Sequence, residues 1–192
     1  MKTLFYIFLN LLVIAVNGQS NCFESCYSNF DQSKIPVPQR NFEILSNLIG
    51  CKAPGFNVVS IDGTQIDSDL LRGRIVVLNF WFEACAPCIE ELPELNELVE
   101  KYRNKKVVFI AFGRDNPKVI NEFLKTKKFD YQIIPVVDGL AKKFCILAGW
   151  PTNMVLDKNG YVRQIFSGGK ADKNKREIFD RLDPIITKYL DD

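Results

Sequence analysis

Residues 74–95 read RIVVLNFWFEACAPCIEELPEL, and this stretch decides the fold. Its first part, residues 74–82, is an almost continuous apolar run, which is typical of a strand buried on both faces. From Ile89 onward apolar residues recur at the spacing of one helix face. Cys85 and Cys88 therefore lie where a buried strand gives way to a long helix.

The flanking segments alternate between strand and helix patterns. We expect a hairpin at 56–66 turning at Asp62-Gly63, a strand at 107–113, a helix at 117–128, a short strand at 131–137, a short helix at 139–146, a hairpin at 152–166 turning at Asn159-Gly160, and a closing helix at 173–190 that is kinked or broken near Pro184. A buried strand, a crossover helix and a second buried strand favour parallel pairing, to which the last hairpin adds antiparallel strands. The pattern predicts an α/β fold with a central mixed β-sheet flanked by helices.

The composition excludes several classes of function. The chain has 192 residues, 47% of them hydrophobic, and a net charge of only +2, which fits one globular domain and does not indicate nucleic-acid binding. It contains no histidine, which excludes Cys-His and Ser-His dyads and zinc sites built on imidazole. Proton transfer must therefore involve cysteine, a carboxylate, lysine, tyrosine or water.

The N-terminus predicts export. Lys2 precedes an apolar run from Leu4 to Val16, and small residues follow, so we interpret residues 1–18 as a cleaved secretory signal peptide. An uncleaved membrane anchor is the alternative, and lipidation of Cys22 is disfavoured by the surrounding QSNC. We expect a secreted or periplasmic protein, where disulfides persist.

Downstream of this segment we expect two parts. Residues 19–50 form an N-terminal extension, and residues 51–192 form the folded domain.

The pair Cys85 and Cys88 has three interpretations. A helix N-terminus stabilises a thiolate, so Cys85 would be the attacking nucleophile and Cys88, one turn further in, the resolving thiol. A zinc site would require a second pair, for which only Cys22 and Cys26 offer themselves. A permanent structural disulfide is the third interpretation. The position between strand and helix favours redox chemistry, with no metal and no bound cofactor.

The remaining cysteines leave the pairing open. Cys145 is interpreted as a buried free thiol, with a bond to Cys51 or to a cysteine of the extension as the alternative. Cys22 could pair with Cys26, or either of these with Cys51, because connectivity cannot be read from sequence.

Two longer segments carry a family resemblance. APGFNVVSIDGTQIDSDLLRGRIVVLNFWFEACAPCIEELPELNEL at 53–98 and GWPTNMVLDKNGYV at 149–162 resemble the TlpA/ResA-like thiol-disulfide oxidoreductases of the thioredoxin fold. The resemblance extends over about 53 to 190. One position departs from it, because Ala84 stands where the family has tryptophan, so the redox potential of relatives does not transfer.

The resemblance implies a thioredoxin-like fold and a set of site residues. Glu91 would lie near the thiols and take the proton of Cys88. Pro151 would follow a cis peptide bond beside the cysteine pair and offer its backbone to an extended partner segment, and Trp150 would contact the substrate. Expected partners are protein disulfides or dithiols and a membrane thiol electron donor, and the protein is expected to be a monomer.

We therefore predict an extracytoplasmic thiol-disulfide oxidoreductase that acts as a reductase. The alternative is a thioredoxin-fold binding module whose Cys85–Cys88 disulfide is structural and undergoes no redox turnover. A peroxidase of the peroxiredoxin type would require threonine three residues before the reactive cysteine, where this chain has Phe82.

Overall fold

The fold is described by a computed structural model for residues 22, 23, 26, 45–135, 138–146, 149–169, 172 and 174–192. Its elements, in chain order, are β1 (Asn57–Val59), β2 (Gln65–Asp67), the 3-10 helix η1 (Ser68–Leu71), β3 (Ile75–Trp81), α3 (Ala86–Tyr102), β4 (Val107–Gly113), α4 (Pro117–Leu124), β5 (Gln132–Ile134), α5 (Asp138–Lys143), β6 (Thr152–Leu156), β7 (Val162–Ser167) and α6 (Glu177–Asp191).

The main sheet has five strands in the order β5-β4-β3-β6-β7. β3, β4 and β5 run parallel, and β6 and β7 are antiparallel to their neighbours, which confirms the predicted mixed sheet. All seven residues of β3 are buried, since this strand lies in the middle of the sheet with a layer on either face. β1 and β2 form a separate two-stranded hairpin.

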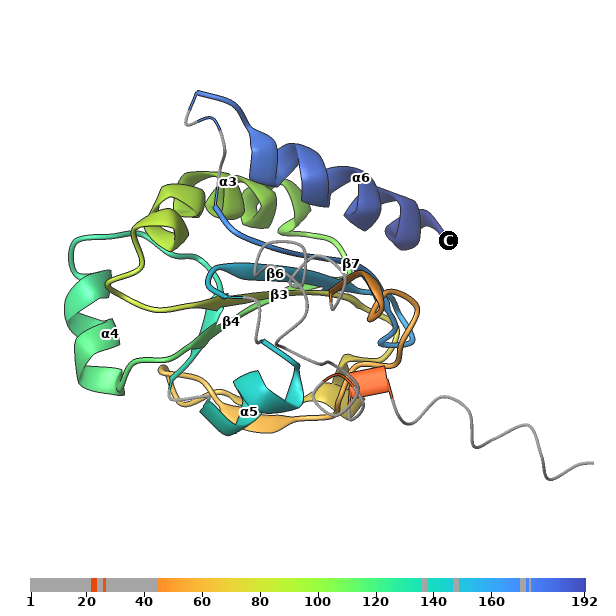
Figure 1. The fold of residues 1–192 in the computed structure, drawn as a ribbon, viewed down its shortest axis with the longest axis horizontal. Coiled ribbons are helices and arrows are strands. Elements are labelled where there is room, and N and C mark those ends of the chain that lie inside the picture. The colour runs from red at the N-terminus through yellow and green to blue at the C-terminus, as the bar shows by residue number, and fades with distance from the viewer. Residues whose placement is uncertain are drawn as a thin grey trace, which may run out of the picture.

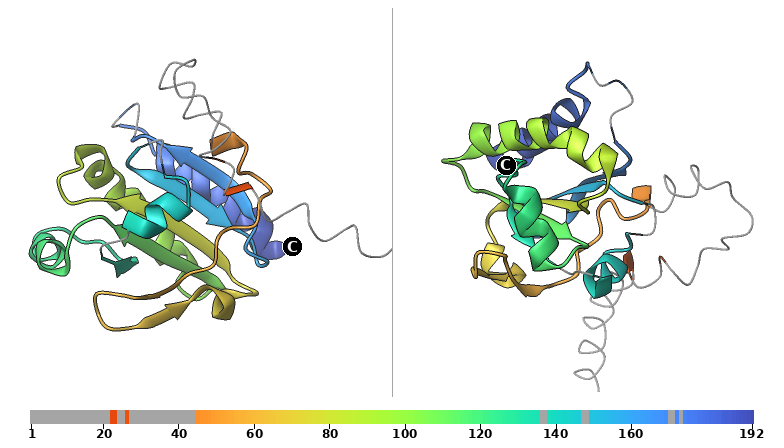
Figure 2. Two further views of the ribbon diagram at one scale, coloured as in Figure 1. Left: turned by 60° about the horizontal axis from the view of Figure 1, so that its bottom comes forward. Right: turned by 90° about the vertical axis from the view of Figure 1, so that its left-hand side faces the viewer.

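Side chains of the central strands alternate between two cores. Val76, Leu78 and Phe80 join the core that also contains the β1–β2 hairpin residues and Phe144 after α5. Ile75 and Val77 face the other core, which α3 and α6 cover. Figure 1 shows these two layers above and below the sheet, and Figure 2 shows the same sheet from two further directions. The period of two residues in a strand is the cause of this division.

Two disulfides attach the N-terminal extension to the core on the α5 side. Cys22 bonds Cys51 and Cys26 bonds Cys145, and between them Phe23 is buried edge-on against Phe144. The interpretation of Cys145 as a free thiol was therefore wrong. The partner is 119 residues away in sequence, so no local pattern could indicate it. Closing loops of this length stabilises a fold by about 2–5 kcal/mol.

The disulfides of the extension also bear on two earlier alternatives, which are lipidation of Cys22 and a metal site shared by the two cysteine pairs. The sulfur of Cys22 is engaged with Cys51, and neither Cys22 nor Cys26 lies in the core that contains Cys85 and Cys88. The two pairs therefore do not share a metal site. The predicted signal peptide, residues 1–18, lies outside the described residues. No helix within the described ranges is long and apolar enough to cross a membrane.

Most predicted elements are present, with shifted ends. Both hairpins form, whereas the helix predicted at 117–128 ends at Leu124 and the closing helix begins at Glu177. Of the two outcomes expected at Pro184, a kink or a break, the break does not occur, because α6 continues through this residue. Its buried residues, Ile178, Phe179, Leu182 and Ile186, lie on both sides of the proline, and their packing outweighs the lost backbone hydrogen bond.

Candidate active site

Cys85 and Cys88 form a disulfide at the first turn of α3. Cys85 is the N-cap residue of the helix, and its sulfur accepts a hydrogen bond from the backbone N–H of Cys88 at 3.3 Å. Pro87 occupies the first turn, where its missing N–H costs nothing. Both cysteines are almost fully buried, and Cys88 is slightly more buried than Cys85. On reduction, the same N–H and the positive end of the helix would stabilise a thiolate at Cys85.

The loop before Cys85 is tied to the neighbouring strand. The backbone N–H of Glu83 donates to the carboxylate of Asp115 at 2.6 Å, and the N–H of Arg114 donates to the carbonyl of Trp81 at 3.1 Å. Asp115 lies in the loop between β4 and α4, so the parallel pair β3–β4 positions it. These bonds fix the entry of the chain into the cysteine motif.

A buried polar chain runs beneath the cysteine turn. Asn79 of β3 and Asn153 of β6 are directly opposite each other in the sheet register. The amide N–H of Asn79 donates to Asn153 Oδ1 at 2.9 Å, and Asn153 Nδ2 donates to Glu91 Oε2 at 3.0 Å. All three residues are buried, with at most 1% of their surface exposed. Glu91 lies one turn after Cys88 on the same face of α3, so the chain of hydrogen bonds leads toward Cys88.

The environment of Glu91 favours its protonated form. Burial raises the pKa of this carboxyl group from 4.5 to about 8, the hydrogen bond from Asn153 lowers it, the nearby Glu94 raises it, and the positive charge of Arg181 lowers it. Burial dominates because a charged carboxylate loses its hydration there. A carboxyl group with a pKa near neutrality can both accept and return a proton.

Pro151 and Trp150 lie at the start of β6. The peptide bond between them is cis, as the resemblance implied. Pro151 is buried, and its carbonyl accepts hydrogen bonds from the N–H of Gly168 and the hydroxyl of Ser167, both at 3.0 Å. Because the carbonyl of Pro151 is already bonded within the fold, backbone pairing with a partner would have to use Trp150 instead.

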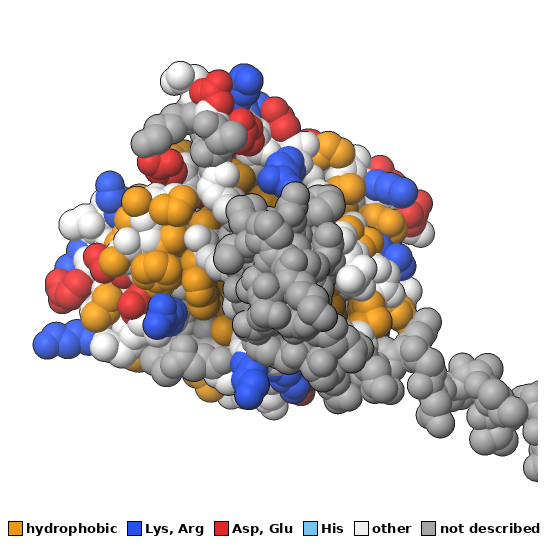
Figure 3. Space-filling model, viewed as in Figure 1, with side chains coloured by type: hydrophobic (Ala, Val, Ile, Leu, Met, Phe, Trp, Pro, Cys, Tyr) orange, Lys and Arg blue, Asp and Glu red, His pale blue; other side chains and the backbone are white. Residues whose placement is uncertain are grey.

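The surface around the disulfide is apolar. The indole of Trp150 is half-buried, and its ring lies 6.0 Å from that of Phe82 in an edge-on arrangement. Pro87 and Ala84 are exposed on the cysteine turn itself. Figure 3 shows hydrophobic side chains gathered on the side of the molecule where α3 begins. This surface could contact the apolar residues of a polypeptide substrate.

Gly169 approaches the cysteine turn very closely, and we expect Gly169→Ala to disturb it. A Cβ atom at this position would lie 2.6 Å from Cβ of Pro87, so the turn would have to move. The expected result is a loss of about 1–3 kcal/mol in the free energy of unfolding and a several-fold slower reaction of reduced Cys85 with an aromatic disulfide reagent. The control is Gly139→Ala in α5, where a Cβ meets no atom within 4 Å. Equal rates for the two variants would contradict this prediction.

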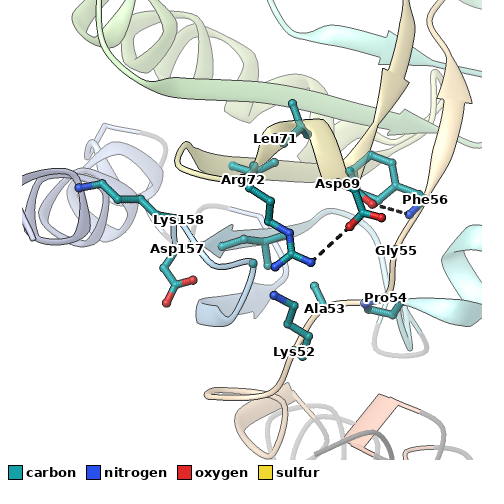
Figure 4. A pocket seen from close by; sticks show the side chains of 14 residues that line it. Lys52, Ala53, Pro54, Gly55, Phe56, Asp69, Leu71, Arg72, Asp157 and Lys158 are labelled. Atoms are coloured by element: carbon teal, nitrogen blue, oxygen red, sulfur yellow. Dashed lines mark hydrogen bonds and ion pairs between the residues drawn. The ribbon is translucent and has the colours of Figure 1, made fainter.

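A cavity lies at the far end of β3 from the disulfide. It measures about 250 Å³ and is lined by Lys52, Arg72 and Val76, among others (Figure 4). Lys52 and Arg72 both donate to the carbonyl of Asn159, and Arg72 also pairs with Asp69 at 3.3 Å. The cations of this cavity are thus already bonded within the protein, and the cavity contributes nothing to the cysteine site.

The structure brings the predicted residues Cys85, Cys88 and Glu91 together on one face of α3. Trp150 also packs against the core that contains both cysteines. The sequence interpretation missed Asn79, Asn153, Asp115 and Gly169. A polar residue inside an apolar strand was the available signal for the two asparagines, because such residues are seldom buried without a partner.

Comparisons with known proteins agree with this geometry. Residues 49–165 match the AhpC/TSA family. The thiol-disulfide oxidoreductase ResA of Bacillus thuringiensis is 31% identical over 137 residues, which cover 71% of this chain and 79% of the relative.

Two solved structures show the same fold. A putative thiol:disulfide interchange protein DsbE from Chlorobium tepidum superposes with a TM-score of 0.65 at 24% identity, covering 74% of this chain and 97% of the other. A putative protein disulfide isomerase from Bacteroides thetaiotaomicron gives 0.64 at 26% identity, covering 75% and 91%.

Proposed function

Because this chain belongs to the AhpC/TSA family of thioredoxin-like proteins and is a thiol-disulfide oxidoreductase, we propose that it reduces disulfides of partner proteins outside the cytoplasm. The observation that carries the proposal is the Cys85–Cys88 disulfide at the N-terminus of α3 with a buried carboxyl group one turn further on. This arrangement contains a nucleophile, a resolving thiol and a proton acceptor.

The proposed reaction has two steps. The thiolate of Cys85 attacks a disulfide of the partner, so that one partner sulfur leaves and a mixed disulfide forms. Cys88 then loses its proton to Glu91 and attacks the sulfur of Cys85, which releases the second partner sulfur as a thiolate. The two cysteines carry both electrons, and a thiol donor, which we propose to be membrane-bound, reduces the pair again.

The binding of the partner would use the surface beside the disulfide. Trp150 is half-buried against Phe82 and precedes the cis bond, so its backbone is the edge at which an extended segment could pair. Pro151 holds the backbone next to this edge in place, since its own carbonyl accepts hydrogen bonds from Gly168 and Ser167.

The two disulfides of the extension support an extracytoplasmic location. Cys22–Cys51 and Cys26–Cys145 fasten the extension, and structural disulfides of this kind persist in oxidising compartments. The reductase direction is proposed separately. Where Glu91 is ionised, above its pKa of about 8, its charge opposes a thiolate at Cys88, which raises the free energy of the reduced pair and makes it a better electron donor.

The direction is tested by the equilibrium reduction potential of Cys85–Cys88, titrated against a defined thiol buffer in a chain starting at Gln19. We expect a value near that of thioredoxin, about −270 mV. A value near about −120 mV would instead indicate a protein that installs disulfides. A pair that cannot be cycled at all would favour the binding module with a structural disulfide.

A further inference from the structure

We propose that Asn153 is a positioning residue for the resolving step: oriented by Asn79, it holds Oε2 of Glu91 and leaves Oε1 as the atom that takes the proton of Cys88. The inference rests on the proposed role of Glu91 in the reaction. It adds the residues that determine which carboxylate oxygen acts and over which pH range.

The orientation of the Asn153 amide is fixed by its neighbour. Asn79 presents its Nδ2 donor to one end of this amide, so that end must be the oxygen, Oδ1. The other end, Nδ2, is then directed at Glu91 and can only donate. Asn79 and Asn153 are paired in the sheet register, and both are buried, so neither amide can be turned by solvent.

The two oxygens of Glu91 differ in their surroundings. Oε2 accepts from Asn153 at 3.0 Å, whereas Oε1 is buried and has no hydrogen-bond partner among the described residues. A proton therefore goes to Oε1, because Oε2 is already oriented toward a donor. Cys88 lies one turn earlier on the same face of α3 and is buried in the core that this face meets.

Asn153 differs from the other polar groups around Glu91. Glu94 lies one turn after Glu91 on the same face of α3. Its carboxylate accepts hydrogen bonds from the N–H groups of Ile178 and Phe179, both at 2.9 Å, and so holds the start of α6 in place. The positive charge of Arg181 in α6 lowers the pKa of Glu91, whereas burial, and after it the charge of Glu91, raises the pKa of the Tyr131 hydroxyl. Asn153, by contrast, donates a direct hydrogen bond to this carboxylate.

The proton transfer balances within the reaction. The S–H bond of Cys88 breaks and an O–H bond forms at Oε1. The resulting thiolate makes the Cys85–Cys88 bond while the bond between Cys85 and the partner breaks. The partner sulfur leaves as a thiolate and is reprotonated by water, and Glu91 returns its proton to solvent. No oxidant or reductant beyond the partner disulfide is needed.

The test is the Asn153→Ala substitution in the otherwise unmodified protein, with two readouts taken from pH 5 to pH 10. One is the titration midpoint of the Glu91 carboxyl carbon, followed by NMR. The other is the rate at which Cys88 resolves a mixed disulfide between Cys85 and glutathione. Losing a hydrogen bond to a charged group favours the neutral acid, so both midpoints should move upward by about one to two pH units. Asn79→Ala, which only frees the amide of Asn153, should give a smaller shift in the same direction.

Two further variants keep the result interpretable. Asn153→Ser retains a hydroxyl donor and serves if the alanine variant does not fold. Met154→Ala is the matched control, since Met154 is the next residue of β6 and its side chain is buried in the opposite core. This control should lose stability without moving either midpoint.

The outcomes distinguish the inference from the proposed function. If Asn153→Ala moves neither midpoint while Glu91→Gln still abolishes the pH dependence of resolution, the inference fails and the role of Glu91 stands. If Glu91→Gln leaves the rate profile unchanged, the proposed proton transfer fails, and the inference fails with it.

Discussion

Cys88→Ser is expected to stop turnover and to trap the protein as a mixed disulfide with its partner through Cys85. Without the neighbouring thiol, release depends on thiols in solution, which compete poorly with a group already held next to the reacting sulfur. We expect resolution to slow by about 10³-fold or more. The measurement is stopped-flow release of a disulfide-linked peptide, together with non-reducing electrophoresis of the trapped species.

The matched control for this experiment is Cys85→Ser. It removes the nucleophile and retains Cys88, which is the more buried of the two cysteines, so it should trap nothing. If Cys88→Ser also traps nothing, Cys85 does not attack partner disulfides. That result would favour a binding module whose disulfide is structural.

Glu91→Gln is expected to remove most of the pH dependence of both stability and resolution. The pKa of Glu91 is about 8 in the folded chain, against 4.5 for the ordinary carboxyl group. Between these values the folded state binds more protons than the unfolded state. The contribution of Glu91 to stability is therefore complete below about pH 4.5 and is lost as the pH rises through 8.

The size of this effect follows from the shift. A difference of this magnitude corresponds to several kcal/mol at most, since each pKa unit is about 1.4 kcal/mol. The free energy of unfolding, measured in urea at a series of pH values, should fall between pH 5 and pH 9 in the unmodified protein. It should stay nearly level in Glu91→Gln. A parallel fall in both proteins would show that another group titrates.

The rate of resolution depends on pH in the opposite direction to the free energy of unfolding, since it should rise as Glu91 ionises. Only ionised Glu91 can accept the proton of Cys88, so the rate of resolution should rise with pH up to about 8. Glutamine cannot accept it, and we expect resolution at neutral pH to be slower by about 10²-fold, as for the loss of a general base.

Much of the fold could be predicted from local patterns. The apolar run before Cys85 predicted the buried β3, and the Asn159-Gly160 signal predicted the hairpin of β6 and β7. The position of the Cys85–Cys88 pair at a helix start was predictable for the same reason, since it depends on the adjacent strand and helix. That the helix would continue through Pro184 could not be predicted locally, because this depends on the packing of α6 residues on both sides of the proline.

What the sequence by itself determined was the order of the elements, the cysteine motif at a helix start and the absence of histidine from the chemistry. The tertiary structure alone decided which residues surround that motif. Asn153 donates a hydrogen bond to Glu91 across a sequence separation of 62 residues, and Cys26 forms a disulfide with Cys145 across 119 residues. Such contacts depend on strand register and on the packing of distant segments, and neither leaves a periodic signal in the chain.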